Sequence, residues 1–484
     1  MKIVHVASEI SPFSKSGGLA DVVGALPGAL AAAGHEVWTV SPRYAGVAPQ
    51  AQYTGFTPKI TLANTTHEAA IVRLDRDGVR HLFVSNPMYE RDGIYSDQNG
   101  DFGDNHVRYA LLCQAALHCA RRFAGDDPIL HIHDWQAALL PIYLVGWWQP
   151  LGLLTGARTV LSLHNPMHQG RFGPAAFGDL ELPGRWFAPW ALEFHGDLSM
   201  LKGGILFADQ LSTVSPTFAR EILTPGGGFG LDTVLASRAV DVSGILNGLD
   251  VDAWNPRSDP HLPATYGADD LTGKQICKAE LQAELGLPID PDAPLIGSVG
   301  RLDPQKGIEL MADSIPWLAE QGAQVVVLGS AAAAHRHFES WLAQLEDRFP
   351  HSVRAWIGYS EPLAHRIQAG ADFFVMPSLF EPCGLTQMSS MRYGTVPVVR
   401  RTGGLADTVL PYAKDASTGT GFLFGPPTAQ ALRDALWYAI DVFRNDSDGY
   451  AGLQQRGMAA DFSWAAAVPG YLATYERARA LIRH

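Results

Sequence analysis

Short apolar, β-branched runs recur along the chain, and each is followed by a Gly-rich or helix-like segment. Residues 2–8 (KIVHVAS) are the first such run and are expected to form a buried strand. A Gly-rich loop at 15–18 (KSGG) and a helix-like segment ended by Gly34 follow, before a second apolar run at 36–42 (EVWTVSP). This strand–helix–strand order predicts parallel pairing, because parallel strands need a crossover connection.

The same alternation continues along the first half of the chain and restarts near residue 295. Further buried strands are predicted in the first half at 81–86, 129–135 and 159–165, and in the second half at the start of 294–307 and at 324–330, 353–359, 372–378 and 396–402. The chain is therefore expected to hold two α/β domains of similar, doubly wound style.

Asn, Gly and Pro cluster at 247–256 (NGLDVDAWNP), which marks the expected boundary between the domains. The tail is helical by composition despite Pro469. We predict an N-terminal domain at 1–246, a second domain at 247–460 and a C-terminal helical segment at 461–484, a length of chain that suits more than one core.

Charge and composition narrow the class of ligand. Charged residues make up 18% of the chain and the net charge is −13 at pH 7, so a nucleic-acid partner, which needs a basic face, is not expected. A neutral polysaccharide is compatible with this balance. Any anionic ligand must be held by locally placed Lys or Arg side chains.

Cysteine usage and hydropathy bear on location. The four cysteines, Cys113, Cys119, Cys277 and Cys383, form no CxxC pair and no zinc-type cluster with histidine, which favours a reducing cytoplasm. The N-terminus resembles a buried strand rather than a cleaved leader, and no run approaches the length of a membrane span.

The pentapeptide GGLAD occurs twice, at Gly17–Asp21 and at Gly403–Asp407. Each copy follows a predicted strand and opens a helix-like segment. Coincidence between two Gly-rich loops is one interpretation. The other is a pair of backbone amide cradles at helix N-termini, which present unpaired N–H groups and the positive end of the helix dipole to an anion.

Two basic residues follow the first predicted strand of the second half. Arg301 and Lys306 lie in GRLDPQKG, at a strand end, where open parallel sheets bind their ligands. Arg offers a planar fork to a diphosphate and Lys a point charge. The alternative is that both are solvated loop charges.

An acidic residue occurs in PSLFEPCGLTQ, just after another predicted strand. Glu381 could bind sugar hydroxyls there, and the backbone N–H groups after Gly384 could bind a phosphate. Alternatively, Glu381 caps the following helix and Cys383 is a small buried apolar residue.

Polar residues also end two strands of the first half. Asp134 follows HIH, and His164 and Asn165 follow the next strand. These histidines lack the spacing of metal ligands. The DxD match at Asp250 and Asp252 lies in the predicted linker and is interpreted as structural, so no metal is expected.

Taken together, these motifs resemble bacterial glycogen synthases and plant starch synthases. The shared motifs occur in the family's order from residue 1 to about 475: KSGGLADVVGALP, HIHDWQA, LHN, LKGG, VSP, NGLDVDAWNP, GRLDPQKG, FEPCGLTQ, TGGLADTV and DFSW. The resemblance implies two Rossmann-like domains facing a central cleft, the GT-B arrangement, with the C-terminal helix returning to the first domain. It implies transfer of glucose from ADP-glucose to an α-1,4-glucan with retention of anomeric configuration, and no cofactor.

The resemblance also implies roles for individual residues. Arg301, Lys306 and Lys15 neutralise the leaving diphosphate, Glu381 holds glucose hydroxyls, and His164 lies at the glucosyl group. Asp134 and Asn165 line the sugar and acceptor side. The implied donor contacts are Gly18, Asp21, Asn247, Tyr359 near the adenine, Cys383, Gly384, Leu385, Thr386, Gly403 and Gly404.

Two other classes of function, an oxidoreductase and a non-catalytic binding protein, lead to different expectations for the sequence. A nicotinamide-dependent oxidoreductase needs GxGxxG after the first strand and an acidic residue after the second, whereas this chain has KSGG and then Arg43. A catalytically silent glucan-binding protein would not need Lys15, Arg301, Lys306 and Glu381 together. The chain also has Pro166-Met167-His168 where the family commonly has an aliphatic-Ala-Tyr run, so UDP-glucose as donor or another acceptor stays the alternative within the class.

Overall fold

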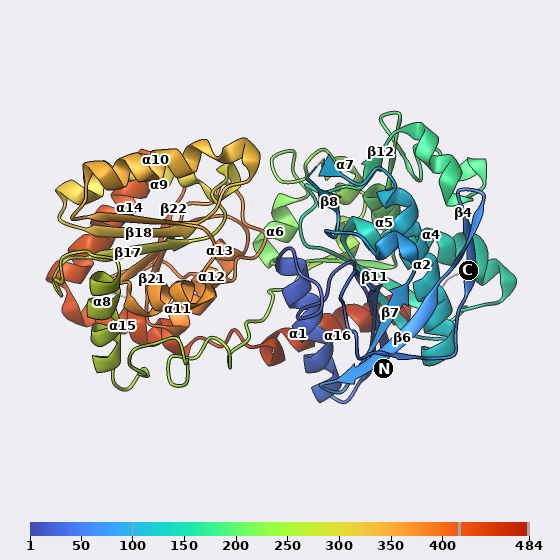
Figure 1. The fold of residues 1–484 in the computed structure, drawn as a ribbon, viewed down its shortest axis with the longest axis horizontal. Helices are drawn as coiled ribbons and strands as arrows, with labels where there is room; N and C mark the ends of the chain where they lie inside the picture. The colour runs from blue at the N-terminus through green and yellow to red at the C-terminus, as the bar shows by residue number, and fades with distance from the viewer. Residues whose placement is uncertain (99, 415–417, 482–484) are drawn as a thin grey trace. The chain divides into compact units, whose positions relative to one another are not determined.

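The computed structural model describes residues 1–98, 100–414 and 418–481. It divides into two compact units (Figure 1). Unit 1 is Met1–Gly248 together with the segment from Trp464 onward, and unit 2 is Leu249–Ser463. The end of the predicted C-terminal segment, 482–484, lies outside the described residues. In the part of the chain that is described, no helix is long and apolar enough to cross a membrane.

Unit 1 is built on a nine-stranded sheet in the order β16-β15-β11-β10-β1-β2-β7-β6-β3. Its strands from β16 to β7 pair in parallel, as predicted from the alternating pattern, and β6 and β3 add an antiparallel edge. The strands are β1 (Lys2–Val6), β2 (Glu36–Pro42), β3 (Gln52–Tyr53), β6 (Ala70–Arg76), β7 (Val79–Ser85), β10 (Ile129–His133), β11 (Arg158–Leu163), β15 (Gln210–Thr213) and β16 (Val242–Gly244).

Helices and small ribbons surround this sheet. The helices are α1 (Gly18–Ala32), α2 (Asn105–Cys119), α3 (Asp134–Ala137), α4 (Leu140–Tyr143), α5 (Met200–Phe207), α6 (Pro216–Glu221), α7 (Asp232–Ala236) and α16 (Trp464–Ala480). The ribbons are β4 (Lys59–Leu62) with β5 (Thr65–Glu68), β8 (Ser96–Asp97) with β9 (Gly100–Asp101), and β12 (Arg171–Phe172), β13 (Glu193–Phe194) and β14 (Asp197–Ser199).

Unit 2 contains a fully parallel six-stranded sheet in the order β19-β18-β17-β20-β21-β22. Numbered within the unit, this is 3-2-1-4-5-6, the Rossmann order. The strands are β17 (Leu295–Val299), β18 (Gln324–Gly329), β19 (Val353–Ile357), β20 (Phe373–Met376), β21 (Val396–Arg400) and β22 (Phe422–Phe424). Its helices are α8 (Thr272–Glu284), α9 (Ile308–Glu320), α10 (His337–Arg348), α11 (Glu361–Gly370), α12 (Thr386–Arg392), α13 (Gly403–Thr408), α14 (Ala429–Asn445) and α15 (Ser447–Ala459).

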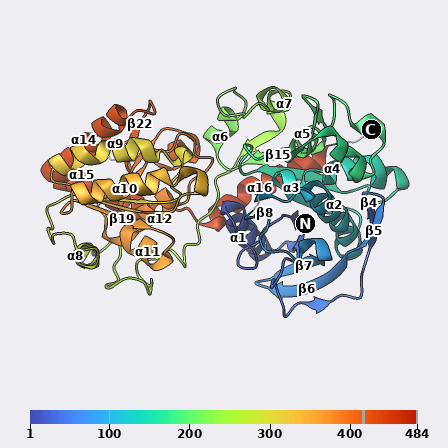
Figure 2. The same ribbon diagram turned by 45° about the horizontal axis from the view of Figure 1, so that its top comes forward.

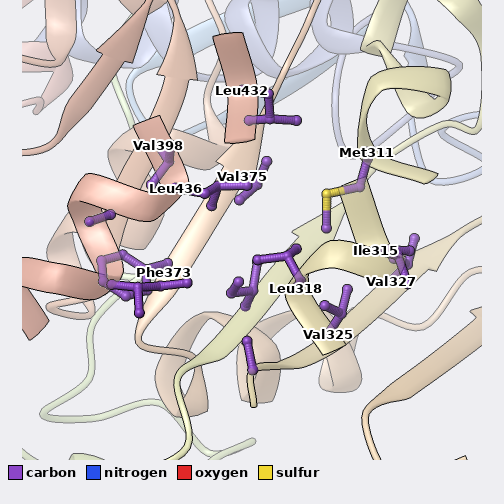
Figure 3. Close-up of a cluster of buried hydrophobic side chains, with 14 of the residues drawn as sticks. Met311, Ile315, Leu318, Val325, Val327, Phe373, Val375, Val398, Leu432 and Leu436 are labelled. Carbon is purple, nitrogen blue, oxygen red and sulfur yellow. The ribbon is translucent and has the colours of Figure 1, made fainter. Parts of the chain in front are cut away.

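The buried side of unit 2 shows why these runs become strands. Val325 and Val327 alternate along β18 and pack with Ile315 and Leu318 of α9, and Phe373 of β20 lies in the same cluster (Figure 3). Alternate residues of a strand share one face, so a β-branched run buries a continuous apolar layer against the helices.

The C-terminal helix α16 packs on unit 1. Tyr471 and Tyr475 are buried in one cluster with Ile3 of β1 and Val160 of β11, and α16 lies beside α1 (Figures 1 and 2). The last helix of the chain therefore completes the core that the first strand begins, as the resemblance implied.

Each sheet has a topological switch point, where later strands of the chain are added on the opposite side of the first strand from the earlier ones. In unit 1 this point lies between β1 and β10, and in unit 2 between β17 and β20. Crevices at the carboxyl ends of such strand pairs are where open α/β sheets bind ligands. The segments that follow these four strands are the predicted site motifs.

Several predicted strands end earlier than expected. The strand predicted at 129–135 ends at His133, the one at 159–165 ends at Leu163, and the one at 353–359 ends at Ile357. Asp134 has φ +54°, which an extended strand cannot include. The residues beyond these strand ends are therefore loop or helix residues at the ligand-binding edge.

Candidate active site

The loop after β1 carries Lys15, Gly17 and Gly18 at the start of α1. No side chain caps this helix, and a Cβ added to either glycine would meet nothing within 4 Å. The start of α1 therefore has no side-chain cap and has open space beside its two glycines, which suits a phosphate at a helix N-terminus. Lys15 Nζ lies 2.7 Å from Asp21 Oδ1, so these two predicted residues form an exposed ion pair.

A buried carboxylate that the sequence motifs did not indicate organises this loop. Glu9 accepts hydrogen bonds from Ser16 Oγ at 2.8 Å and from Gly17 N at 3.3 Å, and also from Ser16 N. The Tyr95 hydroxyl donates to the same carboxylate. Glu9 lies three residues past the end of β1, so its place near the strand end was the signal that could have identified it.

The residues after β10 and β11 form the second part of the unit 1 site. Asp134 Oδ1 accepts from the backbone N–H of His164 at 2.7 Å, which ties the two strand ends together. Burial raises the pKa of Asp134 to about 7, against the opposing effect of the His164 and Asn165 backbone N–H groups. A positive φ at a non-glycine residue is costly, and such strain is characteristic of functional sites.

His164 and Asn165 are both partly exposed, but their partners differ. His164 Nε2 lies 3.0 Å from His133 Nδ1, and burial lowers the pKa of His164 to about 4. Asn165 Oδ1 accepts from Met167 N at 3.2 Å and so shapes the turn that leads into the unusual Pro166–His168 segment.

The unit 2 site brings two predicted residues together directly. Lys306 Nζ lies 2.6 Å from Glu381 Oε2, joining the segments that follow β17 and β20. Glu381 is buried and also accepts from Ser378 Oγ at 3.1 Å, whereas Lys306 keeps 28% of its side chain exposed. A partly exposed ammonium is thus held at the ligand-binding edge by a buried acid.

Arg301 takes a different partner. Its guanidinium pairs with Asp303 Oδ2 at 2.8 Å and donates to Gln305 Oε1 at 3.1 Å, and 67% of the side chain is exposed. Asp303 in turn accepts from Lys306 N at 3.1 Å and caps this short turn. The carboxylate of Asp303 therefore holds the Arg301 guanidinium and the backbone of Lys306, a role the sequence did not reveal.

The second GGLAD copy differs from the first. A Cβ on Gly403 would lie 1.9 Å from the Glu381 carbonyl oxygen, and one on Gly404 would lie 2.0 Å from that of Cys383. Gly404 N donates to Glu381 O at 3.1 Å. These glycines permit close packing on the FEPCG loop, which gives them a structural reason beside their predicted donor contacts.

The remaining donor-side predictions are distributed over the strand ends. Cys383 is buried, while Gly384, Leu385 and Thr386 lead into α12 and are partly exposed. Tyr359 follows β19, is 86% exposed and reaches Glu361 Oε2 at 3.5 Å, so the structure does not join it to the Lys306–Glu381 pair.

Asn247 lies in unit 1, at the end next to unit 2 in the chain. Its Oδ1 is buried and has no hydrogen-bond partner among the described residues. Since a buried amide oxygen rarely stays unpaired, this atom is a candidate for a ligand contact.

Two groups bear on metal binding. Ligand nitrogens of His5, His131 and His133 lie within 4.8 Å of one another in the core of unit 1. His131 already uses both ring nitrogens, toward Tyr475 Oη at 2.8 Å and Ser162 Oγ at 2.6 Å, so the donor set does not fit an ion. In the DxD match, Asp250 Oδ1 accepts from Asp252 N and Ala253 N and stabilises a turn.

The paired α/β units and their strand-end cations define a glycosyltransferase of the GT-B fold, and family models agree. Residues 2–237 match the starch synthase catalytic domain, and residues 284–442 match glycosyl transferases group 1. The glycogen synthase of Anaeromyxobacter dehalogenans strain 2CP-1 is 49% identical over 477 residues, covering 98% of both chains. Soluble starch synthase 1 of Oryza sativa subsp. indica is 43% identical over 98% of this chain and 78% of its own.

A solved structure agrees over the whole length. The catalytic domain of starch synthase IV from Arabidopsis thaliana, bound to ADP and acarbose, is 33% identical and superposes with a TM-score of 0.89 over 99% of each chain. The sucrose-phosphate synthase of Thermosynechococcus elongatus, at 17% identity and a TM-score of 0.62, shares the fold. The chain belongs to the glycogen and starch synthase family, as its motifs implied.

Proposed function

We propose that this enzyme transfers glucose from ADP-glucose to the non-reducing end of an α-1,4-glucan such as glycogen, with retention at the anomeric carbon. The observation that carries the proposal is the full-length match to a starch synthase bound to ADP and acarbose, together with a glycogen synthase 49% identical over 98% of the chain.

The geometry of the two units supports this chemistry. Cleavage of the glycosidic bond moves negative charge onto the leaving diphosphate. Lys306 and Arg301 at the switch point of unit 2, and Lys15 with the uncapped start of α1 in unit 1, are cationic or dipolar groups suited to that charge. In this proposal Glu381, which accepts from Lys306 Nζ and Ser378 Oγ, also accepts from glucose hydroxyls. The leaving phosphate then takes the proton of the acceptor hydroxyl on the same face of the sugar.

A donor panel with glycogen as acceptor tests the proposal. ADP-glucose is expected to give the highest kcat/KM for glucan elongation, above UDP-glucose. Equal rates or a reversed order would overturn the donor assignment and leave the glycosyltransferase class intact.

A second candidate differs in the acceptor. The segment Pro166-Met167-His168 departs from the family pattern, and Met167 is 43% exposed beside Asn165. Glycogen, maltoheptaose and free glucose should be compared at fixed donor. Elongation of the two glucans alone supports the glucan assignment, and preferred use of free glucose favours a related transferase with another acceptor.

The proposal includes no metal, because Lys15, Arg301 and Lys306 can supply the positive charge that a divalent ion supplies elsewhere. Turnover is therefore expected to survive an excess of EDTA. A loss of turnover that Mg²⁺ or Mn²⁺ restores would mean that Asp250 and Asp252 had been misinterpreted.

A cytoplasmic location is also part of the proposal. None of the four cysteines is in a disulfide, and all are buried, as suits a reducing compartment. Fractionation of cells that express the tagged chain at native level tests this.

A further inference from the structure

Three imidazoles form a hydrogen-bonded row that runs from the core of unit 1 to the candidate site. His5 of β1 and His133 of β10 are fully buried, and His164 follows β11 at the ligand-binding edge. His5 Nδ1 lies 3.1 Å from His133 Nε2, and His133 Nδ1 lies 3.0 Å from His164 Nε2. His133 therefore uses both of its ring nitrogens within the row, whereas His5 and His164 each use one.

The sheet register produces this row. β1 and β10 are parallel neighbours with His5 opposite His131, and His133 lies two residues further along β10, on the same face as His131. β11 is the next strand, and His164 follows its last residue, Leu163. His131 lies within the group but is bonded elsewhere, to Ser162 and Tyr475, so it is not a member of the row.

All three rings of the row are neutral at pH 7. Burial lowers the pKa of His5 to about 3 and that of His164 to about 4, and it lowers the pKa of His133 well below the ordinary value. A neutral imidazole carries one N–H and one lone pair. The two hydrogen bonds must then point the same way along the row, either outward from His5 or inward from His164.

The inner end of the row selects the direction. His5 Nε2 is buried and has no hydrogen-bond partner among the described residues. If the hydrogen bonds pointed inward from His164, His5 Nε2 would carry a buried N–H that has no acceptor. Buried N–H groups without an acceptor are rare, because no hydrogen bond compensates for the free-energy cost of removing them from water. Outward polarity leaves only an unused lone pair there. It makes His5 donate to His133, His133 donate to His164 Nε2, and His164 keep its own proton on Nδ1.

We propose that His133, oriented by His5, is a positioning residue that fixes His164 as the Nδ1–H tautomer, so that His164 serves as a permanent hydrogen-bond donor toward the sugar. No hydrogen bond from the described parts of the chain occupies His164 Nδ1. Its Nε2 lone pair is consumed by His133, so His164 cannot act as a general base. The identity of the ligand as a sugar rests on the proposed function, whereas the tautomer does not.

The tautomer is measurable without any substrate. Long-range ¹H–¹⁵N spectra of the enzyme labelled on histidine ring nitrogens distinguish protonated from unprotonated positions, and a His164→Asn variant identifies the His164 signals. His164 is expected to show a protonated Nδ1 and an unprotonated Nε2 at pH 7 to 8. A protonated Nε2 would overturn the inference, and this holds even if every His133 variant failed to fold.

Two matched variants test the positioning role. His133→Asn keeps an amide donor near the position of Nδ1, and His133→Leu has a similar shape without one. The Leu variant should lose about tenfold in kcat/KM, roughly the worth of one hydrogen bond, with His164 shifting toward Nε2–H, and the Asn variant should retain both rate and tautomer. Equal losses of kcat/KM in the two variants would show that His133 contributes by packing and not through its hydrogen bond to His164.

A control separates this effect from general damage to the core. His81 is a buried histidine of β7 that bonds Thr39 Oγ1 at 2.9 Å and is not part of the row. His81→Leu is expected to leave the His164 tautomer and kcat/KM unchanged. Failure of wild-type enzyme to use ADP-glucose would count against the proposed function, while the wild-type spectrum alone decides the tautomer.

Discussion

The buried carboxylate of Glu381 forms an ion pair with the partly exposed ammonium of Lys306. Lys306 lies 2.6 Å away, and the Ser378 hydroxyl also donates to the acid. Isolated buried charges are strongly disfavoured, so each partner fixes the place of the other. A substitution at Lys306 should thus remove a cation from the leaving group and also release Glu381.

Lys306→Ala is expected to lower kcat by about 10²–10³, the usual effect of removing one preorganised group that stabilises transition-state charge. Arg301→Lys should recover little activity relative to Arg301→Ala, because a point charge does not reproduce the bidentate fork. Steady-state kinetics with circular dichroism to verify the fold measure both effects. Arg336→Ala, an exposed cation of unit 2 outside the site, is the control. A Lys306→Ala enzyme with normal kcat and a raised KM would make this lysine a ground-state contact.

Asp134 gives unit 1 a predicted pH dependence. Its folded-state pKa is raised to about 7 from an ordinary value of 3.8 by burial, so between these values the folded state binds the proton more tightly than the unfolded state. The contribution of this group to stability is therefore present at low pH and is lost as pH rises through about 7. Asp134→Asn should gain stability over wild type from pH 5 to pH 7 and level off above, measured by hydrogen exchange of unit 1. A difference that does not vary with pH would contradict the raised pKa.

For individual residues, the sequence predicted which side chains lie at strand ends. It predicted less well which residues those side chains contact. Strand-end placement and residue type singled out Lys306 and Glu381, whose side chains the structure brings together. Glu9 was missed because its role depends on backbone N–H groups of Ser16 and Gly17 and on Tyr95, far along the chain. Such contacts follow from the folded path of the loop, and no periodic pattern records them.

Among the elements, α8 carries two ion pairs that differ in burial. Lys278 lies 2.7 Å from Asp372, with side chains 8% and 10% exposed, and Asp372 also accepts from Leu295 N at 2.8 Å. Glu284, further along α8, pairs with Arg366 of α11 at 2.8 Å, with side chains 39% and 27% exposed. The two pairs allow burial to be compared on one helix.

Lys278→Met should cost about 3–5 kcal/mol of the stability of unit 2, because Asp372 is left buried and unpaired. Arg366→Met should cost no more than about 1 kcal/mol, as is usual for a solvent-screened pair. Denaturant unfolding followed by hydrogen exchange of unit 2 peptides measures both. Similar costs for the two variants would show that burial does not control the strength of the Lys278 pair.

At the level of elements, buried parallel strands were predictable and edge strands were not. Runs such as QVVVLG are buried at every position and contain no charged residue, since both faces of a central parallel strand are covered. β6 and β3 instead lie at the edge of their sheet, and β6 mixes buried Ile71 and Val72 with exposed Arg76. The antiparallel edge of unit 1 therefore left no signal comparable to that of the central strands.

For the whole molecule, chain order and spatial order differ at the C-terminus. The segment after unit 2 returns to unit 1, where Tyr475 is fully buried and its hydroxyl lies 2.8 Å from His131 Nδ1. The family resemblance implied this return, whereas composition alone predicted only a helix. One unit is thus formed from both ends of the chain, and its core is incomplete until the last helix is made.

Tyr475→Ala should therefore destabilise unit 1 alone, by about 3–5 kcal/mol, as is usual for deleting a buried aromatic side chain. Hydrogen exchange should increase in β1 and β11, which share its cluster, and stay unchanged in the strands of unit 2. Tyr450→Ala is the matched control, because Tyr450 is a buried tyrosine of the unit 2 core whose hydroxyl donates to Asp372 O at 2.9 Å. It should produce the opposite pattern. Equal loss of protection in both units from either variant would show that the units unfold together and that α16 does not serve unit 1 specifically.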